Sequence, residues 1–365
     1  MGTVILQRAM VAVGTIVALA ACGGAASSGS SSTPTPQADV GSGQLTGAGA
    51  TFPEPFYSKA FYQYNLDHSQ VSVNYQAIGS GGGIQQFTKG TVDFGASDVP
   101  MAAADSAAAG GDASLVQVPT ILGVAAIAYN LQGVDKLKLD GPTVANIYLG
   151  TVKKWDDPAI KSLNSGVTLP STDITVVHRS DSSGTSYTFT DYLGKISPDW
   201  KTRVGVGKAV QWPAGVGANG NQGVGQQVKT TDGAIGYVEL AYVVQSNLRQ
   251  AYLKNVAGQF VQASEAGATA AAQAAGSAVS PTNFSITNEP GAKSYPITTF
   301  SWIFLRTSQT DATKGKALVY LFKWLVTSGQ AQGKPLQYAA LPKPVQTYAL
   351  DTLKKVTANG KAILS

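Results

Sequence analysis

The sequence predicts an α/β fold built around a largely parallel sheet. Apolar stretches of strand length alternate with segments of helical pattern: 71–78 is followed by 83–90, 92–97 by 101–110, and 174–179 by 185–194. Strand followed by helix, repeated along a chain, is the pattern of parallel βαβ units. The chain has 365 residues, 44% of them hydrophobic, which suffices for a sizeable core and for two domains of ordinary size.

Charge and cysteine content narrow the classes of function. The formal net charge is +5, but Lys and Arg are scattered and form only short runs such as Lys153-Lys154, which argues against a nucleic-acid partner. With two histidines and one cysteine, we expect no transition-metal site. We expect no cofactor either. The glycine-rich stretch 215–220 follows Trp212-Pro213 rather than an apolar strand, so we interpret it as a loop and not as a dinucleotide site.

The first 43 residues indicate export and anchoring. Arg8 precedes an apolar run that is shorter than the ~20 residues of a membrane-spanning helix, so residues 1–21 are predicted to be a signal peptide. The end of this segment, Leu-Ala-Ala before Cys22, resembles a lipoprotein cleavage site at which Cys22 would carry a lipid. An ordinary signal peptide with an unused cysteine is the less favoured alternative. Residues 22–43, rich in Ser, Gly and Pro, are predicted to be a flexible tether.

Together, these N-terminal features predict a folded body, beginning near Gln44, that lies outside the cytoplasmic membrane. The lipid on Cys22 would hold it to the outer face of that membrane. This location argues against a cytosolic enzyme that uses nucleotide cofactors.

Three predicted strand-to-helix junctions share one chemistry. The expected helix caps are Thr51 (with Pro53 in the first turn), Ser80, and Ser183 (followed by Gly184 and Thr185). We expect Gly194 to end the third helix. A helix N-terminus offers unpaired N–H groups and the positive end of the helix dipole, and it binds anions. Each junction alone is more simply an ordinary cap, but three at strand ends, two of them glycine-rich, favour one shared anion site.

Charged residues near these junctions sharpen the prediction. Arg179 ends an apolar strand and can place its forked guanidinium on an oxyanion, and Asp181 could hold that fork. Asp98 is unexpected in an anion site because a carboxylate repels an anion. It fits an anion that carries a proton, such as phosphate, whereas fully ionised sulfate has no proton to donate. A helix cap at Asp98 is an equally good local explanation.

The order of motifs along the chain resembles one family. LTGAGATFPEPFYSKAF, VNYQAIGSGGGIQQF, VDFGASDVP, RSDSSGTS, GAIGYVELAY and YPITTF, from Leu45 to about Phe300, are similar to successive motifs of the substrate-binding proteins of phosphate-specific ABC transporters. The resemblance implies a type II periplasmic-binding-protein fold, in which two α/β lobes joined by two hinge strands close on one phosphate in the cleft between them. The hinge strands would lie near 124–130 and 295–302.

The resemblance also implies residue roles and boundaries. The first lobe would comprise 44–127 and 296–365, and the second lobe 128–295. Phosphate would be delivered to the permease of the transporter, and we expect a monomer. The implied phosphate ligands are Thr51, Phe52 (through its backbone N–H), Ser80, Asp98, Arg179, Ser183, Gly184 and Thr185, with Asp181 orienting the arginine. Two departures from the family pattern are Ser182, where glycine is common, and His178 beside the arginine.

Two alternatives stay open at this point. One is a binding protein for another tetrahedral oxyanion. The other is a secreted esterase or phosphatase, since His178, Asp181 and Ser183 are the residue types of a catalytic triad. These three residues lie so close along the chain that they cannot readily align as nucleophile, base and orienting acid, and no Gly-Xaa-Ser-Xaa-Gly motif surrounds Ser183. We therefore predict a binding protein that is not an enzyme.

Overall fold

The computed structural model describes residues 39–365. The predicted signal peptide, Cys22 and all but the end of the predicted tether lie outside the described residues. Within the described part, Val40 is already buried and Gly43 begins the first strand, so the folded body includes residues before Gln44. None of the helices of residues 39–365 combines the length and the apolar character that crossing a bilayer requires.

Within residues 39–365, nine strands form one large mixed sheet. The order across the sheet is β2-β1-β3-β12-β4-β8-β6-β7, and β9 adds to the side of β4. Two groups of parallel strands, β2-β1-β3 and β8-β6-β7, flank the antiparallel strands β12 and β4. The strands are β1 (Gly43–Gly49), β2 (Val71–Ala77), β3 (Phe94–Ser97), β4 (Leu115–Tyr129), β6 (Thr175–Arg179), β7 (Val216–Ala218), β8 (Ala234–Glu239), β9 (Arg249–Gln250) and β12 (Thr298–Arg306).

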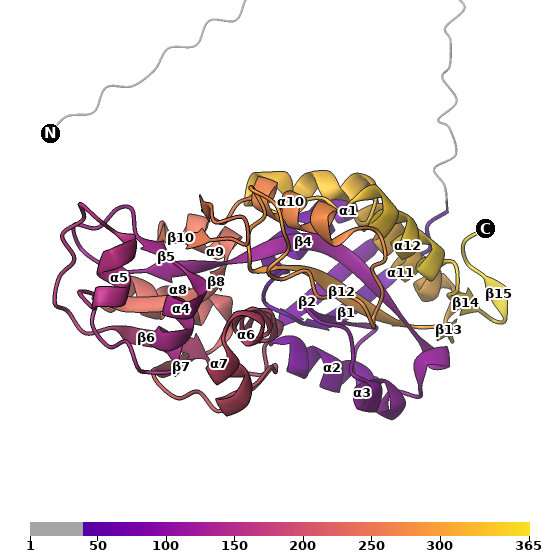
Figure 1. Ribbon diagram of the computed structural model, residues 1–365. Coiled ribbons are helices and arrows are strands. Elements are labelled where there is room, and N and C mark those ends of the chain that lie inside the picture. The colour runs from indigo at the N-terminus through magenta and orange to yellow at the C-terminus, as the bar shows by residue number, and fades with distance from the viewer. Residues whose placement is uncertain (1–38) are drawn as a thin grey trace, which may run out of the picture. The chain divides into compact units, whose positions relative to one another are not determined.

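Strand β4 connects the two groups of strands (Figure 1). Nine of its first ten residues, all except Thr120, pair with β12, and its last five pair with β8. All fifteen of its residues are buried, as expected for an uninterrupted apolar stretch of a sheet that is covered on both faces. The pairing of β12 with β4 shifts register between Ser301, opposite Ile121, and Trp302, opposite Pro119, so β4 carries a bulge at Thr120.

Helices cover both faces of each group of strands. In the first group, α2 packs on β1 and β3 while α1 and α11 pack on the opposite face (Figure 1). In the second group, α8 and α6 pack on β8. The helices are α1 (Glu54–Asp67), α2 (Ser80–Lys89), α3 (Ala103–Ala108), α4 (Gly141–Tyr148), α5 (Pro158–Leu163), α6 (Gly184–Ile196), α7 (Pro198–Arg203), α8 (Gly220–Thr230), α9 (Leu240–Gln245), α10 (Glu265–Ala275), α11 (Ala312–Leu325) and α12 (Lys343–Leu353).

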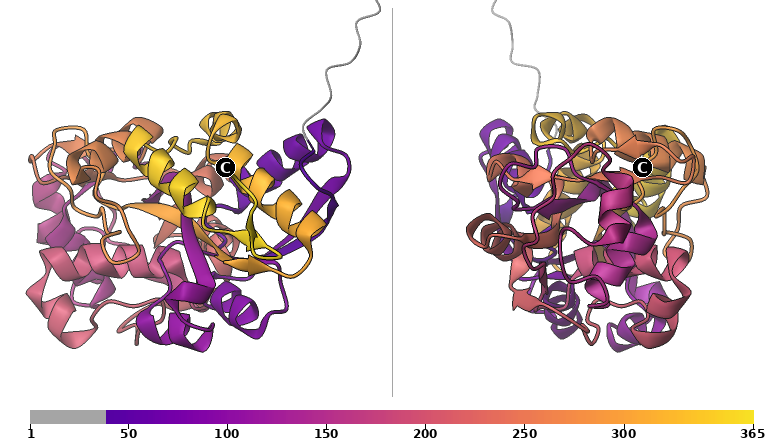
Figure 2. Two further views of the ribbon diagram at one scale, coloured as in Figure 1. Left: turned by 90° about the vertical axis from the view of Figure 1, so that its right-hand side faces the viewer. Right: turned by 60° about the vertical axis from the view of Figure 1, so that its left-hand side comes forward.

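Segments from both ends of the described chain lie together. Figure 2 shows the indigo N-terminal strands and the yellow C-terminal helices in the same half, where α11 contacts β1. The remaining short elements are β5 (Lys138–Leu139), β10 (Tyr252–Lys254), β11 (Phe260–Val261), β13 (Ser308–Gln309), β14 (Thr357–Ala358), β15 (Lys361–Ala362) and the 3-10 turns η1 (Asp112–Ser114), η2 (Ser328–Gln332) and η3 (Lys334–Leu336).

Two sequence expectations about helix α6 have different outcomes. Ser183 is its N-cap, with the side chain accepting a hydrogen bond from the backbone N–H of Ser186, as predicted. The prediction that Gly194 ends the helix is wrong, because α6 continues to Ile196. The absence of a side chain at Gly194 serves packing, since a Cβ there would lie 3.0 Å from Val206. The helix does not continue past Ile196 because the next residue, Ser197, precedes Pro198 and adopts an extended conformation.

The glycine-rich stretch 215–220 is also different from expectation. We interpreted it as a loop, but Val216–Ala218 forms β7 and Gly220 begins α8. The strand is only three residues long and two of them are exposed, so it lacks the apolar alternation by which strands are recognised in sequence. The structure therefore contains a strand-to-helix junction, β7 to α8, that the sequence analysis missed.

Candidate functional site

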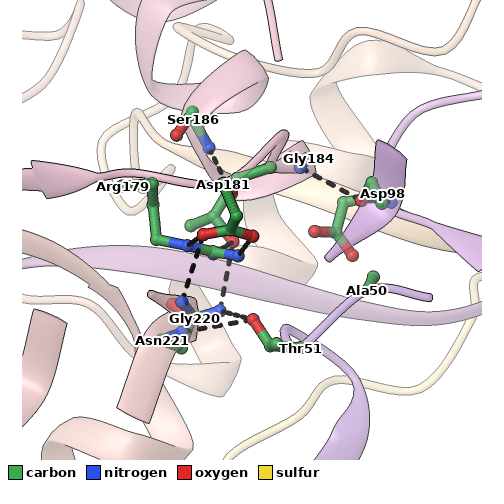
Figure 3. Close-up of polar contacts among 12 residues, drawn as sticks. Ala50, Thr51, Asp98, Arg179, Asp181, Gly184, Ser186, Gly220 and Asn221 are labelled. Atoms are coloured by element: carbon green, nitrogen blue, oxygen red, sulfur yellow. Dashed lines mark hydrogen bonds and ion pairs between the residues drawn. The ribbon is translucent and has the colours of Figure 1, made fainter. Parts of the chain in front are cut away.

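The carboxyl ends of the parallel strands of both groups converge on one region. Strands β1, β2 and β3 lead to Thr51, Ser80 and Asp98, and β6 leads to Arg179 and to the start of α6. In an open α/β sheet, the carboxyl ends of parallel strands are where ligand sites form. The predicted residues are therefore brought close together, as the contacts drawn in Figure 3 and described below establish.

Arg179 supplies a buried positive charge. Its side chain is 1% exposed, and it pairs with Asp181 through two hydrogen bonds, one of them from Nε to Oδ1 at 2.7 Å and the other from Nη2 to Oδ2. Burial alone would raise the pKa of Asp181, but the hydrogen bonds and the charge of Arg179 outweigh it and lower that pKa. The two-point contact fixes the guanidinium plane. Asp181 thus holds the fork of the arginine, as predicted from the sequence.

A glycine lets the first group of strands approach this ion pair. Gly79 precedes α2 with a φ of 87°, a value that residues with a Cβ rarely adopt. A Cβ at this position would also lie 2.3 Å from Oδ2 of Asp181. Next to it, the backbone N–H of Gly81 donates to the carbonyl oxygen of Ser182 at 2.9 Å. The start of α2 is therefore in direct contact with the loop before α6.

Asp98 is a buried carboxyl at the end of β3. It is 1% exposed, and its Oδ1 accepts a hydrogen bond of 2.8 Å from the hydroxyl of Ser301, which lies opposite the bulge of β4. Burial raises the pKa of Asp98 to about 7, although the hydrogen bond from Ser301 and the charge of Arg179 oppose the rise. The alternative that Asp98 caps a helix is wrong, because α3 begins only at Ala103 with Ala102 as its N-cap.

Thr51 and Ser80 are not the helix caps that the sequence predicted. The N-cap of α1 is Pro53 and that of α2 is Gly79, and neither helix has a side-chain cap. The two hydroxyls are engaged instead by groups distant in sequence. The hydroxyl of Ser80 accepts hydrogen bonds from the backbone N–H of Gly184 at 3.0 Å and from that of Asp98 at 3.3 Å. With both lone pairs engaged, its own proton is directed away from these partners.

The start of α6 lies against Asp98. A Cβ on Gly184 would lie 2.6 Å from Oδ2 of Asp98 and 2.6 Å from the hydroxyl of Ser80, so only glycine allows this approach. The first N–H groups of α6 have no partner within the helix. Thr185 is fully buried, and its hydroxyl accepts a hydrogen bond of 3.3 Å from Nη1 of Arg179. The start of α6 therefore lies against both a buried carboxyl and a buried guanidinium.

Phe52 is buried just after Thr51, and its backbone is fixed from the C-terminal part of the chain. Its carbonyl oxygen accepts a hydrogen bond of 2.5 Å from the hydroxyl of Tyr338, while the carbonyl of Thr51 accepts one of 2.6 Å from Tyr242. Both carbonyls are thereby held by tyrosines. The backbone N–H of Phe52 has no hydrogen-bond acceptor within residues 39–365.

Four polar residues of this region were missed by the sequence analysis. Tyr237 accepts from the backbone N–H of Arg179 at 2.9 Å and fixes the end of β6, and Ser301 binds Asp98. Asn221 and Glu239 are fully buried near Thr51 and Tyr338. Burial raises the pKa of Glu239 well above its ordinary value. Tyr237 and Glu239 lie in the motif GAIGYVELAY, and Asn221 follows the glycine-rich stretch that the sequence analysis interprets as a loop, so the signals were present but were not assigned to the site.

The arrangement does not form the triad considered above. Asp181 is committed to Arg179, and the hydroxyl of Ser183 accepts from the N–H of Ser186 at 3.1 Å. Nδ1 of His178 contacts the carbonyl of Arg179, and its ring stacks on Trp212 with centroids 4.8 Å apart. In the described part of the chain, no group of three or more His, Cys, Asp or Glu side chains could hold a metal ion. The geometry offers donors and one acceptor for an anion.

Comparisons with known proteins agree with this fold. A family model described as a PBP superfamily domain matches residues 33–323. The phosphate-binding protein PstS of Xylella fastidiosa (strain 9a5c) is 43% identical over 332 residues, which are 89% of this chain and 90% of that protein. The protein of the same name from Pasteurella multocida is 45% identical over 304 residues, covering 82% and 87% of the two chains.

A solved structure is similar as well. The phosphate-binding protein from Stenotrophomonas maltophilia has a TM-score of 0.67 at 20% identity, covering 85% of this chain and 93% of that one. This likeness concerns the fold and confirms the periplasmic-binding-protein architecture that the sequence predicted. The chain belongs to the PBP superfamily and, within it, to the family of phosphate-binding proteins named PstS.

Proposed function

We propose that this protein binds inorganic phosphate outside the cytoplasmic membrane and delivers it to the permease of a phosphate ABC transporter. One observation carries the proposal. A buried guanidinium and a buried carboxyl whose pKa is raised to about 7 lie at the same converging strand ends, among hydroxyls and helix N-terminal amides. This set matches a tetrahedral anion that has several acceptor oxygens and also a proton to donate. Relatives named phosphate-binding proteins support the assignment.

The proposed ligand set follows from these contacts. Arg179 binds phosphate oxygens through its guanidinium, and Asp98 accepts the phosphate proton. The remaining ligands donate through hydroxyl or backbone N–H groups to the other oxygens: Thr51, Phe52, Ser80, Ser183, Gly184 and Thr185. In this proposal the N–H of Gly184 is shared between Ser80 and the anion. Asp181 does not touch the anion in this proposal, and it orients Arg179. Binding and release require no covalent step, so the protein acts as a carrier and not as an enzyme.

We assign the two lobes to 44–127 with 296–365 and to 128–295, with β4 and β12 as the hinge strands. Contacts between the proposed lobes support a closed arrangement around the site. Examples are the hydrogen bonds from the N–H of Gly184 to Ser80 and from the N–H of Gly81 to the carbonyl of Ser182. The side chain of Lys208 also pairs with Asp105 across the rim at 3.2 Å. Opening would break these contacts and expose the site.

Titration calorimetry on the tether-free body, residues 40–365, tests the proposal. We expect the protein to bind phosphate and arsenate, which both carry a proton near neutral pH, and to reject sulfate. Arg179→Ala should lose most of the phosphate affinity, because a hydrogen bond to a buried charged group contributes about 1.5–3 kcal/mol. The exposed Arg249, which pairs with Asp135 at the surface, provides the control Arg249→Ala with unchanged binding. Equal affinity for sulfate and phosphate would refute the proposed specificity.

The proposed anchoring depends on Cys22 and is tested separately. In cells that make the full chain, we expect the mature protein to begin at Cys22, to carry lipid there and to sediment with membranes. Cys22→Ala should remove the lipid and release the protein from the membrane fraction. Mass spectrometry of the N-terminal peptide measures the modification. A mature protein that begins at another residue, with an unmodified Cys22, would contradict a lipid anchor but not phosphate binding.

A further inference from the structure

Asn221 joins the two parts of the proposed phosphate site. It is the second residue of α8 and is fully buried. Its Nδ2 donates to the hydroxyl of Thr51 at 2.9 Å and to that of Thr185 at 3.2 Å, and its backbone N–H donates to Thr51 at 3.2 Å. Figure 3 shows Asn221 next to Thr51, on the side of Arg179 away from Gly184. Asn221 thus contacts two hydroxyls of the proposed ligand set that come from different lobes.

The orientation of the Asn221 amide is settled by its third partner. Its Oδ1 accepts a hydrogen bond of 2.9 Å from the backbone N–H of Glu239. A backbone N–H can only donate, so the oxygen of the amide must face it and the NH₂ group must face the two threonines. The two hydroxyls therefore act as acceptors toward Asn221.

This arrangement determines where the hydroxyl protons point. A hydroxyl has two lone pairs and one proton. The lone pairs of Thr51 are engaged by the two N–H groups of Asn221, and those of Thr185 by Asn221 and by Nη1 of Arg179. The proton of each hydroxyl is then directed away from these partners. The hydroxyls of Thr51 and Thr185, which could otherwise donate or accept, can then only donate to a ligand. An anion with several unprotonated oxygens requires such donors.

We propose that Asn221 is a positioning residue for anion binding, which makes Thr51 and Thr185 donors and couples them across the two lobes. The inference rests on the proposed phosphate function and goes beyond it, because Asn221 is not itself one of the proposed ligands. It has a clear consequence for energetics. The contribution of Asn221 to affinity passes through the two hydroxyls and disappears when they are absent.

A double-mutant cycle, measured by titration calorimetry with inorganic phosphate, tests this coupling. We expect Asn221→Ala to weaken binding by about tenfold or more, the usual effect of losing buried hydrogen bonds. In a background with Thr51→Val and Thr185→Val, which keep the side-chain shape, the same substitution should change affinity by less than about threefold. Equal effects in both backgrounds, or near-normal binding by Asn221→Ala alone, would overturn the proposal.

A matched control separates positioning from general stability. Asn255 is also buried, and its Nδ2 donates to three backbone carbonyls of the segment 291–294, away from the site. Asn255→Ala should lower the melting temperature and leave phosphate affinity unchanged. Loss of phosphate binding in this control would show that any buried asparagine has the effect, and it would contradict a special role of Asn221.

A second variant keeps the proposal testable if Asn221→Ala does not fold. Asn221→Asp has nearly the same shape as the wild-type residue. Above its pKa, the new carboxyl is ionised and accepts hydrogen bonds at the position where the amide NH₂ donated them. The hydroxyl protons of the two threonines then point toward the carboxylate and no longer toward the anion. We expect phosphate affinity, relative to wild type at the same pH, to fall and then to recover as the pH is lowered and the carboxyl is protonated. If the ratio of the variant's phosphate affinity to that of the wild type did not change with pH, the proposed mechanism would be contradicted. Absence of phosphate binding by the wild-type protein would instead refute the function itself.

Discussion

At the scale of single residues, the site depends on matching each buried donor or acceptor to a partner. Asp98 is the one proposed ligand that accepts, and it lies among donors. Burying a polar group against a group of the same kind leaves both without a hydrogen bond and costs about 1–3 kcal/mol. A single acceptor in a site of donors can therefore decide which of two tetrahedral anions is bound.

Asp98→Asn is expected to weaken the discrimination between phosphate and sulfate. The amide can donate to a fully ionised oxygen and no longer requires a proton on the anion. The ratio of phosphate to sulfate affinity should fall by about tenfold or more, following the cost of one buried mismatch. Competition calorimetry with both anions at pH 7 and above measures the ratio. An unchanged ratio would mean that Asp98 does not contact the anion proton.

At the scale of helices and strands, the junction that precedes α6 has two roles. Ser183 caps the helix through its lone pair and, in the proposed site, donates its proton to the anion. Ser197 has the first role alone, since it is the N-cap of α7 and accepts from the N–H of Trp200 at 3.2 Å. The two serines form a natural pair for separating capping from binding.

Ser183→Ala and Ser197→Ala should both destabilise the protein by about 1 kcal/mol, the usual cost of losing an N-cap side chain. Only Ser183→Ala should also weaken phosphate binding, because only this hydroxyl is a proposed ligand. Chemical denaturation measures the first effect and calorimetry the second. If the two variants bound phosphate equally well, the hydroxyl of Ser183 would be a cap and nothing more.

The elements that sequence predicted best are those with a local signal. The apolar alternation of 71–78 and the serine cap before Gly184 depend on neighbours along the chain, and both are present in the structure. Thr51 and Ser80 were correctly placed at junctions, but their partners, Asn221 and Gly184, are distant in sequence. From local sequence, such hydroxyls are expected to cap helices. In the structure they form tertiary hydrogen bonds instead.

The parts of the site that sequence missed have a common cause. Strand β7 is short and partly exposed, and Ser301 reaches Asp98 only because β12 lies beside β3 in the sheet. Glu239 is an acidic residue at the end of an apolar strand, where sequence gives no sign that it will be fully buried. Strand order in the sheet determines these contacts, and strand order is not encoded locally.

At the scale of the whole molecule, folding buries acidic groups and links stability to pH. The pKa of Asp98 is raised by burial from 3.8 to about 7, and burial also raises that of Glu239. Between pH 4 and pH 7 the folded protein keeps a proton on Asp98 that the unfolded chain has lost. Because the unfolded state then binds fewer protons, the free energy of unfolding falls as the pH rises.

The phosphate-free protein should therefore be more stable at pH 5 than at pH 8, and Asp98→Asn should reduce this difference. Full deprotonation of Asp98 costs up to about 4 kcal/mol, since a tenfold change in proton affinity corresponds to about 1.4 kcal/mol. The amide has no proton to lose, so it removes this part of the pH dependence and leaves that of Glu239. Thermal unfolding at both pH values, in buffers without phosphate, measures the effect. Wild-type and variant curves that fall in parallel would show that Asp98 keeps an ordinary pKa in the folded protein.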